Sequence, residues 1–197
     1  MSTGIQTPLQ SAPVPVARMT ADEFAKRYAG RRAELIDGIP VELPMPQQHH
    51  GKIRYRIAMA IGSFVDAKDL GHVTTNDSFV RVLSKDDAER VRGADVCYFS
   101  YDRLPKGEIP PGLLPVAPNL VVEVRSPSDA WSVIFTKVGE YLGASVTAVL
   151  VLDSETRSAS VFRNDARNPQ QRFTGDEEMT FPDILPGFSV PVKRLFE

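Results

Sequence analysis

The stretch APNLVVEVRSPSDAW, residues 117–131, reads as an apolar strand that carries one glutamate, Glu123, and runs into a Ser-Pro turn. A buried ionised carboxylate is costly unless a partner, a proton or a metal ion compensates it. Asp95 raises the same problem, because it opens the apolar run DVCYF, residues 95–99. If both acids face one cleft, each raises the proton affinity of the other, and a divalent cation is the usual way to keep both ionised. Their oxygen donors suit Mg²⁺.

A structural ion pair is the alternative interpretation of Glu123. Strand alternation places Arg125, two residues further along the chain, on the same face as Glu123. Lys137 follows 14 residues after Glu123, in a helix that is expected to return across the sheet. Either cation could neutralise Glu123 without a catalytic role, so the residues alone leave both interpretations open.

The composition is that of an ordinary globular protein. The chain has 197 residues, of which 42% are hydrophobic and 24% are charged, and this length suits one domain. We expect a flexible tail over residues 1–17, which are rich in Pro, Ser, Thr and Gln, and a single domain over residues 18–197. The longest apolar run, VTAVLVL at residues 146–152, is too short to span a membrane.

Charge and cysteine content narrow the function classes. The net charge is −2 and the pI is near 6.0, so the chain lacks the basic footprint of dedicated nucleic-acid binders, and any contact with nucleic acid must be local. The single cysteine, Cys97, excludes an intrachain disulfide and a thiolate zinc cluster, and its apolar surroundings predict an inert thiol. A reducing, cytoplasmic setting fits this composition.

Helix signals appear at three places in the chain. A Thr-x-x-Glu capping box at residues 20–23 begins a first short helix. A long helix begins near His50, because apolar side chains recur at helical spacing over residues 53–65. The same spacing predicts a second major helix over residues 128–144.

Strand signals fill most of the remaining chain. An Asp-Gly pair at residues 37–38 predicts a tight hairpin turn. Strands are expected at residues 72–83, 92–100, 119–126, 147–153 and 158–163, with a charged turn at 84–90, a proline-rich loop at 105–118 and an irregular apolar closing segment at 181–196. This order of elements predicts an α/β or α+β fold, in which helices flank a mixed central sheet.

Six motifs in this arrangement resemble one bacterial protein family. They are AELIDG (33–38), HHGKI (49–53), GADVCYF (93–99), NLVVEVRSPSD (119–129), FTKVGEYL (135–142) and VLVLD (149–153). Over roughly residues 19–195 the chain resembles the "putative restriction endonuclease" family, a former domain of unknown function within the PD-(D/E)XK nuclease superfamily. The most specific element is Glu-Val-x-Ser-Pro-Ser, followed about a dozen residues later by a lysine and then by a tyrosine in the same helix.

The resemblance implies a restriction-endonuclease-like fold with an acidic cluster at the rim of its sheet that binds Mg²⁺ or Mn²⁺. Matched position by position, it implies that Asp95 binds the metal ion, that Glu123 is the acid of the glutamate-x-lysine motif and that Glu34 is an additional acid. His50 matches a histidine that recurs in the family at the start of the long helix. The carbonyl of Val124 is a further candidate metal ligand.

Two positions depart from the pattern. The superfamily places a lysine two residues after the strand acid, where this chain has Arg125; the family it resembles supplies the lysine from the next helix, which matches Lys137. Val133 stands where relatives often carry an aspartate. An arginine stays protonated, so Arg125 could stabilise phosphate charge but could not act as a base. We therefore expect Lys137 to be the catalytic cation, and Arg125, His50 and Lys52 to contact the substrate.

The leading hypothesis is a divalent-metal-dependent endonuclease that hydrolyses DNA phosphodiester bonds, with Asp95, Glu123, Lys137 and Glu34 in catalysis. The alternative is a non-catalytic domain of the same fold that binds a partner or nucleic acid, because a fold does not fix a function. A glycosidase also uses two carboxylates, but the chain has few aromatic residues to stack sugars. The expected partners are DNA and, through edge strands and the apolar closing segment, a second copy of the chain.

Overall fold

The computed structural model describes residues 17–45, 47–83 and 89–197. In this part of the chain the helices are α1 (Ala21–Arg27), α2 (Gln48–Lys68), α3 (Trp131–Gly143) and α4 (Lys193–Phe196). The strands are β1 (Ala33–Ile36), β2 (Ile39–Glu42), β3 (Gly71–Leu83), β4 (Glu89–Ser100), β5 (Leu120–Arg125), β6 (Ala148–Asp153), β7 (Ser158–Phe162), β8 (Gln171–Thr174), β9 (Glu178–Phe181) and β10 (Leu185–Pro191).

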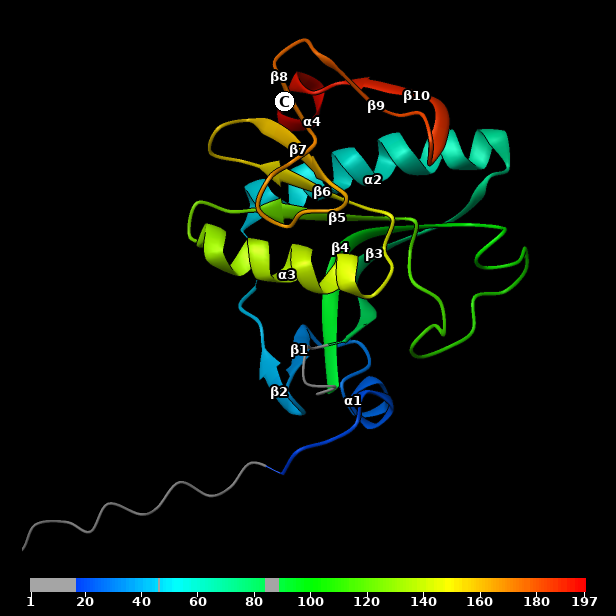
Figure 1. The fold of residues 1–197 in the computed structure, drawn as a ribbon, viewed down its shortest axis with the longest axis vertical. Helices are drawn as coiled ribbons and strands as arrows, with labels where there is room; N and C mark the ends of the chain where they lie inside the picture. Colours follow the sequence, from blue (N-terminus) through cyan, green and yellow to red (C-terminus); the bar gives the residue numbers. More distant parts are fainter. Residues whose placement is uncertain (1–16, 46, 84–88) are drawn as a thin grey trace, which may run out of the picture.

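A mixed eight-stranded sheet forms the centre of the molecule (Figure 1). The strand order is β2-β1-β4-β5-β6-β7-β8, and β3 pairs with β4 outside this path. β5 and β6 run parallel, whereas the other neighbouring strands of the sheet run antiparallel. β9 and β10 form a separate two-stranded sheet. The predicted mixed sheet with flanking helices is confirmed.

Along one edge, β4 pairs first with β1 and further along the chain with β5. Val91 lies opposite Leu35 of β1, and residues 96–98 lie opposite β5. Along its other edge, β4 pairs with β3 over almost its whole length. We call the opening between these two pairings, beside residues 92–95 of β4, the β1/β5 fork. Asp95 therefore lies where the sheet divides.

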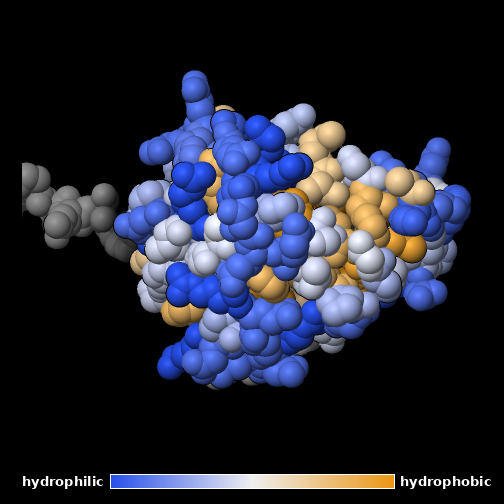
Figure 2. Space-filling view, turned by 90° about the horizontal axis from the view of Figure 1, so that it is seen from above, coloured by the Kyte–Doolittle hydropathy of each residue, from blue (hydrophilic) through white to orange (hydrophobic). Residues whose placement is uncertain are grey.

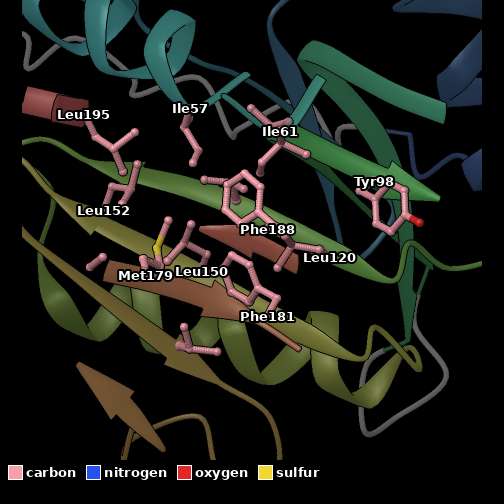
Figure 3. Packing of buried hydrophobic residues seen from close by; sticks show 14 of the residues in the cluster. Ile57, Ile61, Tyr98, Leu120, Leu150, Leu152, Met179, Phe181, Phe188 and Leu195 are labelled. Carbon is pink, nitrogen blue, oxygen red and sulfur yellow. The ribbon is translucent and has the colours of Figure 1, made fainter. Parts of the chain in front are cut away.

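Two layers cover the faces of the main sheet. α2, β9, β10 and α4 lie over one face, and α3 lies over the other. Figure 3 shows the first interface, where Ile57 and Ile61 of α2 and Phe188 of β10 pack against Leu120 and Leu150 of the sheet. Each fully buried aliphatic or aromatic side chain contributes about 1.5–3 kcal/mol to the stability of the fold.

Local sequence signals account for the elements at the N-terminal side. The Thr20 hydroxyl accepts a hydrogen bond from the backbone of Glu23, whose carboxylate accepts one from the backbone of Thr20, so the capping box is confirmed. Asp37 and Gly38 both have positive φ angles in the turn between β1 and β2, as a tight hairpin requires. The predicted long helix is confirmed as α2, whose side chains at helical spacing are buried.

The closing segment differs from its prediction. Residues 181–196 were expected to be irregular, but they contain β10 and α4, and β10 pairs with β9. Prolines at both ends of β10 obscure the strand signal, and the strand is stabilised by long-range packing of Leu185 and Phe188 against the α2 side of the core. Residues 1–16 of the predicted tail and residues 84–88 of the predicted turn lie outside the described residues, so the division into tail and domain stays a prediction.

The surface carries both polar and exposed apolar side chains. The face seen from above in Figure 2 is mostly hydrophilic, with hydrophobic residues exposed in places. Among the described residues, no helix is long and apolar enough to cross a membrane. Burial raises the pKa of the Cys97 thiol, in agreement with the expected inert cysteine.

The close approach of β3 to β4 at Gly71 predicts a sharp effect of a single methyl group. A Cβ at this position would lie 2.0 Å from the carbonyl oxygen of Phe99, so we expect Gly71→Ala to lower the free energy of unfolding by about 1–3 kcal/mol. Gly62 in α2 has nothing within 4 Å of its would-be Cβ, and Gly62→Ala should be neutral or stabilising by up to about 1 kcal/mol. Urea unfolding of both variants tests the prediction, and equal effects would contradict it.

Candidate active site

A cleft opens at the β1/β5 fork. Its volume is about 330 Å³, and β1, β4, β5, α2 and α3 all contribute lining side chains. The residues predicted from the sequence that line this cleft are Glu34, His50, Asp95, Glu123, Val124 and Lys137. The fold thus gathers residues that are far apart in the chain.

Glu123 lies on the α3 side of the cleft. Its buried carboxylate accepts a 2.6 Å hydrogen bond from the Tyr141 hydroxyl at Oε1, and Lys137 Nζ lies 3.3 Å from Oε2. Burial raises the pKa of Glu123 to about 7; the charge of Lys137 opposes this rise, and the charge of Asp95 adds to it. Glu123 therefore remains short of positive charge even with a lysine beside it.

Asp95 lies on the α2 side of the cleft. Its Oδ2 accepts a 2.7 Å hydrogen bond from the backbone N–H of Val124, and its Oδ1 lies 3.1 Å from Arg54 Nε. Burial raises the pKa of Asp95 to about 6, although the charge of Arg54 and the Val124 hydrogen bond oppose the rise. The two acids thus share the same imbalance, and each has its own resident cation.

Lys137 joins the acids of β1 and β5. Its Nζ lies 2.9 Å from Glu34 Oε1 as well as 3.3 Å from Glu123 Oε2. Burial would lower the pKa of Lys137, but the charges of Glu123 and Glu34 outweigh it and raise that pKa. Glu34 also accepts a 2.6 Å hydrogen bond from Arg92, and the two cations lower the pKa of Glu34 against the effect of burial. Lys137 is therefore held as a protonated cation between two carboxylates.

His50 contacts the backbone of β5. Its Nε2 donates a 2.8 Å hydrogen bond to the carbonyl of Val124 and lies 3.6 Å from Asp95 Oδ2. Burial lowers the pKa of His50, so the imidazole is neutral at pH 7. Its buried Nδ1 has no hydrogen-bond partner among the described residues. His50 therefore acts on the Val124 carbonyl and does not neutralise Asp95.

Two predicted substrate contacts lie elsewhere. Arg125 is aligned with Asp153 on the parallel neighbour β6, and its Nη1 lies 2.8 Å from the Asp153 carboxylate and 3.0 Å from that of Glu155. Its guanidinium also stacks over the ring of Trp131. Lys52 is exposed and donates a hydrogen bond to the backbone oxygen of Glu197. Neither side chain lines the cleft, so the geometry gives no support to their predicted substrate contacts.

Three charged residues that the sequence analysis did not assign to the site belong to it. Arg32 and Asp77 line the cleft, and Arg54 contacts Asp95. Arg54 follows His50 by one helical turn, which was a usable signal for its position. Asp77 belongs to an Asn-Asp pair within a strand, a local signal for a bulge. Arg32 has no local signal, because only the folded chain brings it to Asp77.

The oxygen donors of the cleft are of the kind that binds a divalent cation. Across the described residues, no group of three or more His, Cys, Asp or Glu side chains is arranged to hold a metal ion. The cleft still offers hard oxygen donors in the carboxylates of Asp95 and Glu123 and the carbonyl of Val124. That carbonyl has two lone pairs, so a hydrogen bond from His50 leaves one available. Burial raises the proton affinity of both acids, and a divalent cation would offset the cost of ionising them, so in this respect the residues fit Mg²⁺ or Mn²⁺.

A mixed sheet with flanking helices, and two buried acids where the sheet divides, agree with the restriction-endonuclease-like fold that the sequence resemblance implies. The chain belongs to the Uma2 family, described as "Putative restriction endonuclease", whose model matches residues 21–193. A solved structure with a similar fold is that of a "putative nuclease belonging to DUF820" from Anabaena variabilis ATCC 29413, with a TM-score of 0.73 and 21% sequence identity over 90% of this chain and 97% of that one. No curated protein matches the chain.

The raised pKa of Glu123 predicts a pH-dependent stability. A carboxyl group whose folded-state pKa is raised stabilises the fold below its ordinary pKa near 4.5 and loses that contribution as the pH rises through about 7. Glu123→Gln removes the charge and keeps the shape. We therefore expect the variant to be more stable than the wild type near pH 8, by up to about 3 kcal/mol, and nearly equal near pH 5. Urea unfolding in EDTA measures the difference, and a gap of the same size at both pH values would contradict the assignment.

Proposed function

We propose that this protein is a divalent-metal-dependent endonuclease that hydrolyses DNA phosphodiester bonds. Its family membership supports a nuclease function in general. The observation that carries the finer proposal is the burial of Asp95 and Glu123 in one cleft, both with raised pKa values and with Lys137 beside Glu123. Perturbed acids that share a cleft with a cation are typical of catalytic sites.

The proposed ligands of the metal ion are the carboxylates of Asp95 and Glu123 and the carbonyl of Val124. A bound Mg²⁺ or Mn²⁺ would polarise the phosphate and lower the pKa of a bound water. The hydrogen bond from His50 to the Val124 carbonyl orients that carbonyl in the cleft. The hydrogen bond from Tyr141 fixes the rotamer of Glu123 in the same way.

Lys137 is the proposed cation for the charge that develops on the phosphate. It is protonated and its position is fixed by Glu34 on one side and Glu123 on the other. A preorganised positive charge in a buried site stabilises developing negative charge without further reorganisation. Because a protonated lysine accepts no proton, we assign it electrostatic stabilisation and do not assign it the role of general base.

One observation favours the alternative of a non-catalytic domain. Asp95 and Glu123 each already contact a resident cation, Arg54 for the first and Lys137 for the second. A cleft in this state is partly compensated without a metal ion, as a binding module of the same fold would be. The two functions differ in whether a divalent cation binds and whether DNA is cut.

The remaining expectations about partners stay proposals. DNA is the proposed substrate, and a cytoplasmic setting agrees with the buried free thiol of Cys97. A homodimer stays a prediction. Tyr55 and Met59 of α2, with 61% and 49% of their surfaces exposed, are apolar side chains that such a contact would cover.

Calorimetric titration of Mg²⁺ and Mn²⁺ together with plasmid nicking tests the proposal. We expect the wild type to bind metal and nick DNA, and the variant Asp95→Asn/Glu123→Gln to lose both. Asp176→Asn/Glu178→Gln changes two exposed acids and should retain both. Metal binding by the wild type without nicking would favour the binding module, and the absence of metal binding would refute the enzyme.

The role of Lys137 predicts a separate kinetic effect. Lys137→Met removes the positive charge at similar length, so we expect nicking to slow by about 10²–10³-fold. Lys106→Met changes an exposed lysine that is paired with Asp69 outside the cleft and should leave the rate unchanged. Single-turnover nicking measures both rates. An undiminished rate for a folded Lys137→Met protein would assign Lys137 to structural support alone.

A further inference from the structure

A β-bulge in β3 directs Asp77 into the cleft. Thr75 lies opposite Val96 and Ser78 opposite Ala94, so β3 holds one residue more than β4 over this interval. Asn76 and Asp77 both have left-handed backbone conformations, with φ angles of 70° and 59°. Asn and Asp are the residues other than glycine that adopt this conformation most readily, so the Asn-Asp pair suits the bulge.

The opposite strand leaves room for this bulge. Gly93 of β4 faces Asp77, and a Cβ at Gly93 would lie 3.3 Å from the Cβ of Asp77. A larger residue at this position would push the bulge away from β4. The backbone of β3 and the missing side chain at Gly93 therefore act together to hold Asp77 in the wall of the cleft.

Asp77 in turn fixes the guanidinium of Arg32. Arg32 Nε donates to Asp77 Oδ2 at 2.9 Å, Nη2 donates to Oδ1 at 3.1 Å, and Nη1 donates to the backbone carbonyl of Pro44. A guanidinium has five N–H donors. Two N–H donors of Arg32 thus remain without a partner among the described residues, on a group whose plane and position are fixed.

Arg32 differs from the other cation of the cleft. Among the described residues that line the cleft, the arginine and lysine side chains are Arg32 and Lys137. Lys137 contacts two carboxylates, whereas Arg32 contacts one, and the side chain of Arg32 is 23% exposed compared with 13% for Lys137. Asp77 also lies 3.6 Å from Arg54 Nη2, so its negative charge is shared between two arginines. Arg32 is therefore the less compensated of these two cations, and it keeps open N–H donors for an anion.

We propose that Arg32 binds a phosphate group of the nucleic-acid backbone in the cleft, beside Asp95 and Glu123. A planar guanidinium with open N–H donors matches the oxygens of a phosphate better than any other side chain. The identity of the ligand rests on the proposed nuclease function, because a phosphodiester is the anion that enters such a cleft. A contact of this kind positions the strand and carries no information about base sequence.

Salt-dependent DNA binding tests the proposal without cleavage. The affinity of a fluorescent short DNA duplex is measured by anisotropy in EDTA over a series of potassium chloride concentrations, for the wild type and for Arg32→Gln. A residue that neutralises one phosphate contributes about 0.9 to the slope of log K against log salt concentration. We expect Arg32→Gln to reduce the slope by this amount. Arg163→Gln changes an arginine that is paired with Asp183 outside the cleft, and it should keep the wild-type slope.

A second variant keeps the test decisive if Arg32→Gln does not fold. Arg32→Lys retains the charge and loses the planar fork, so we expect an unchanged slope with affinity reduced several-fold. An affinity equal to that of the wild type would overturn the proposal. So would a wild-type slope in folded Arg32→Gln, because Arg32 would then only tie Asp77 to the loop at Pro44.

Nicking of plasmid DNA by the same proteins separates this proposal from the nuclease assignment. If Arg32→Gln reduces the slope but the wild type does not nick with Mg²⁺ or Mn²⁺, the phosphate contact stands and the nuclease assignment fails. If the wild type nicks and the slopes are equal, the nuclease assignment stands and the contact fails. A wild type that neither binds nor nicks DNA would refute both.

Discussion

The burial of two carboxylates on neighbouring strands is the constraint to which the rest of the cleft is fitted. Asp95 and Glu123 are almost completely removed from water, and the cost of ionising them there appears in their raised pKa values. Arg54 of α2 contacts one acid, and Lys137 of α3 contacts the other. Leaving either acid without a cation would cost several kcal/mol, so both helices must be placed accurately against the sheet.

The topology of β4 makes this placement feasible. Because β4 pairs with β1 near Val91 and with β5 from Val96 onward, the sheet opens beside Asp95 without leaving a long unpaired edge. α2 and α3 lie on opposite faces of the sheet (Figure 1). Each helix contributes a cation to the same opening. Strand alternation directs Glu123 towards α3, while its neighbour Val124 packs in the core beneath α2. β5 thus directs side chains towards both helical layers.

The sequence predicted those residues of the site that differ clearly from their neighbours in the chain. Asp95 and Glu123 are conspicuous because they interrupt apolar runs, and α2 is conspicuous because its buried isoleucines recur at helical spacing. Arg32 gives no such signal, since its meaning depends on a long-range contact with Asp77. The contacts of Arg125 also depend on a long-range partner. Strand alternation gives the face on which Arg125 lies, but Asp153, the acid aligned with it on β6, determines what it contacts. β10 was missed because its flanking prolines suppress the local strand signal while tertiary packing stabilises it.

Burial keeps the two acids of the cleft costly to ionise. With Arg54 and Lys137 in place, the pKa values of Asp95 and Glu123 still stand at about 6 and about 7, so near neutral pH a proton competes for the same oxygens as a divalent cation. Binding of the proposed divalent cation would therefore release protons, and its apparent affinity would rise with pH through this range. A third basic residue in contact with the pair would lower both pKa values and remove the competition, but it would also remove the electrostatic reason for a metal ion to enter. A divalent cation of the kind proposed for the cleft would complete the neutralisation of the two acids, which Arg54 and Lys137 leave partial.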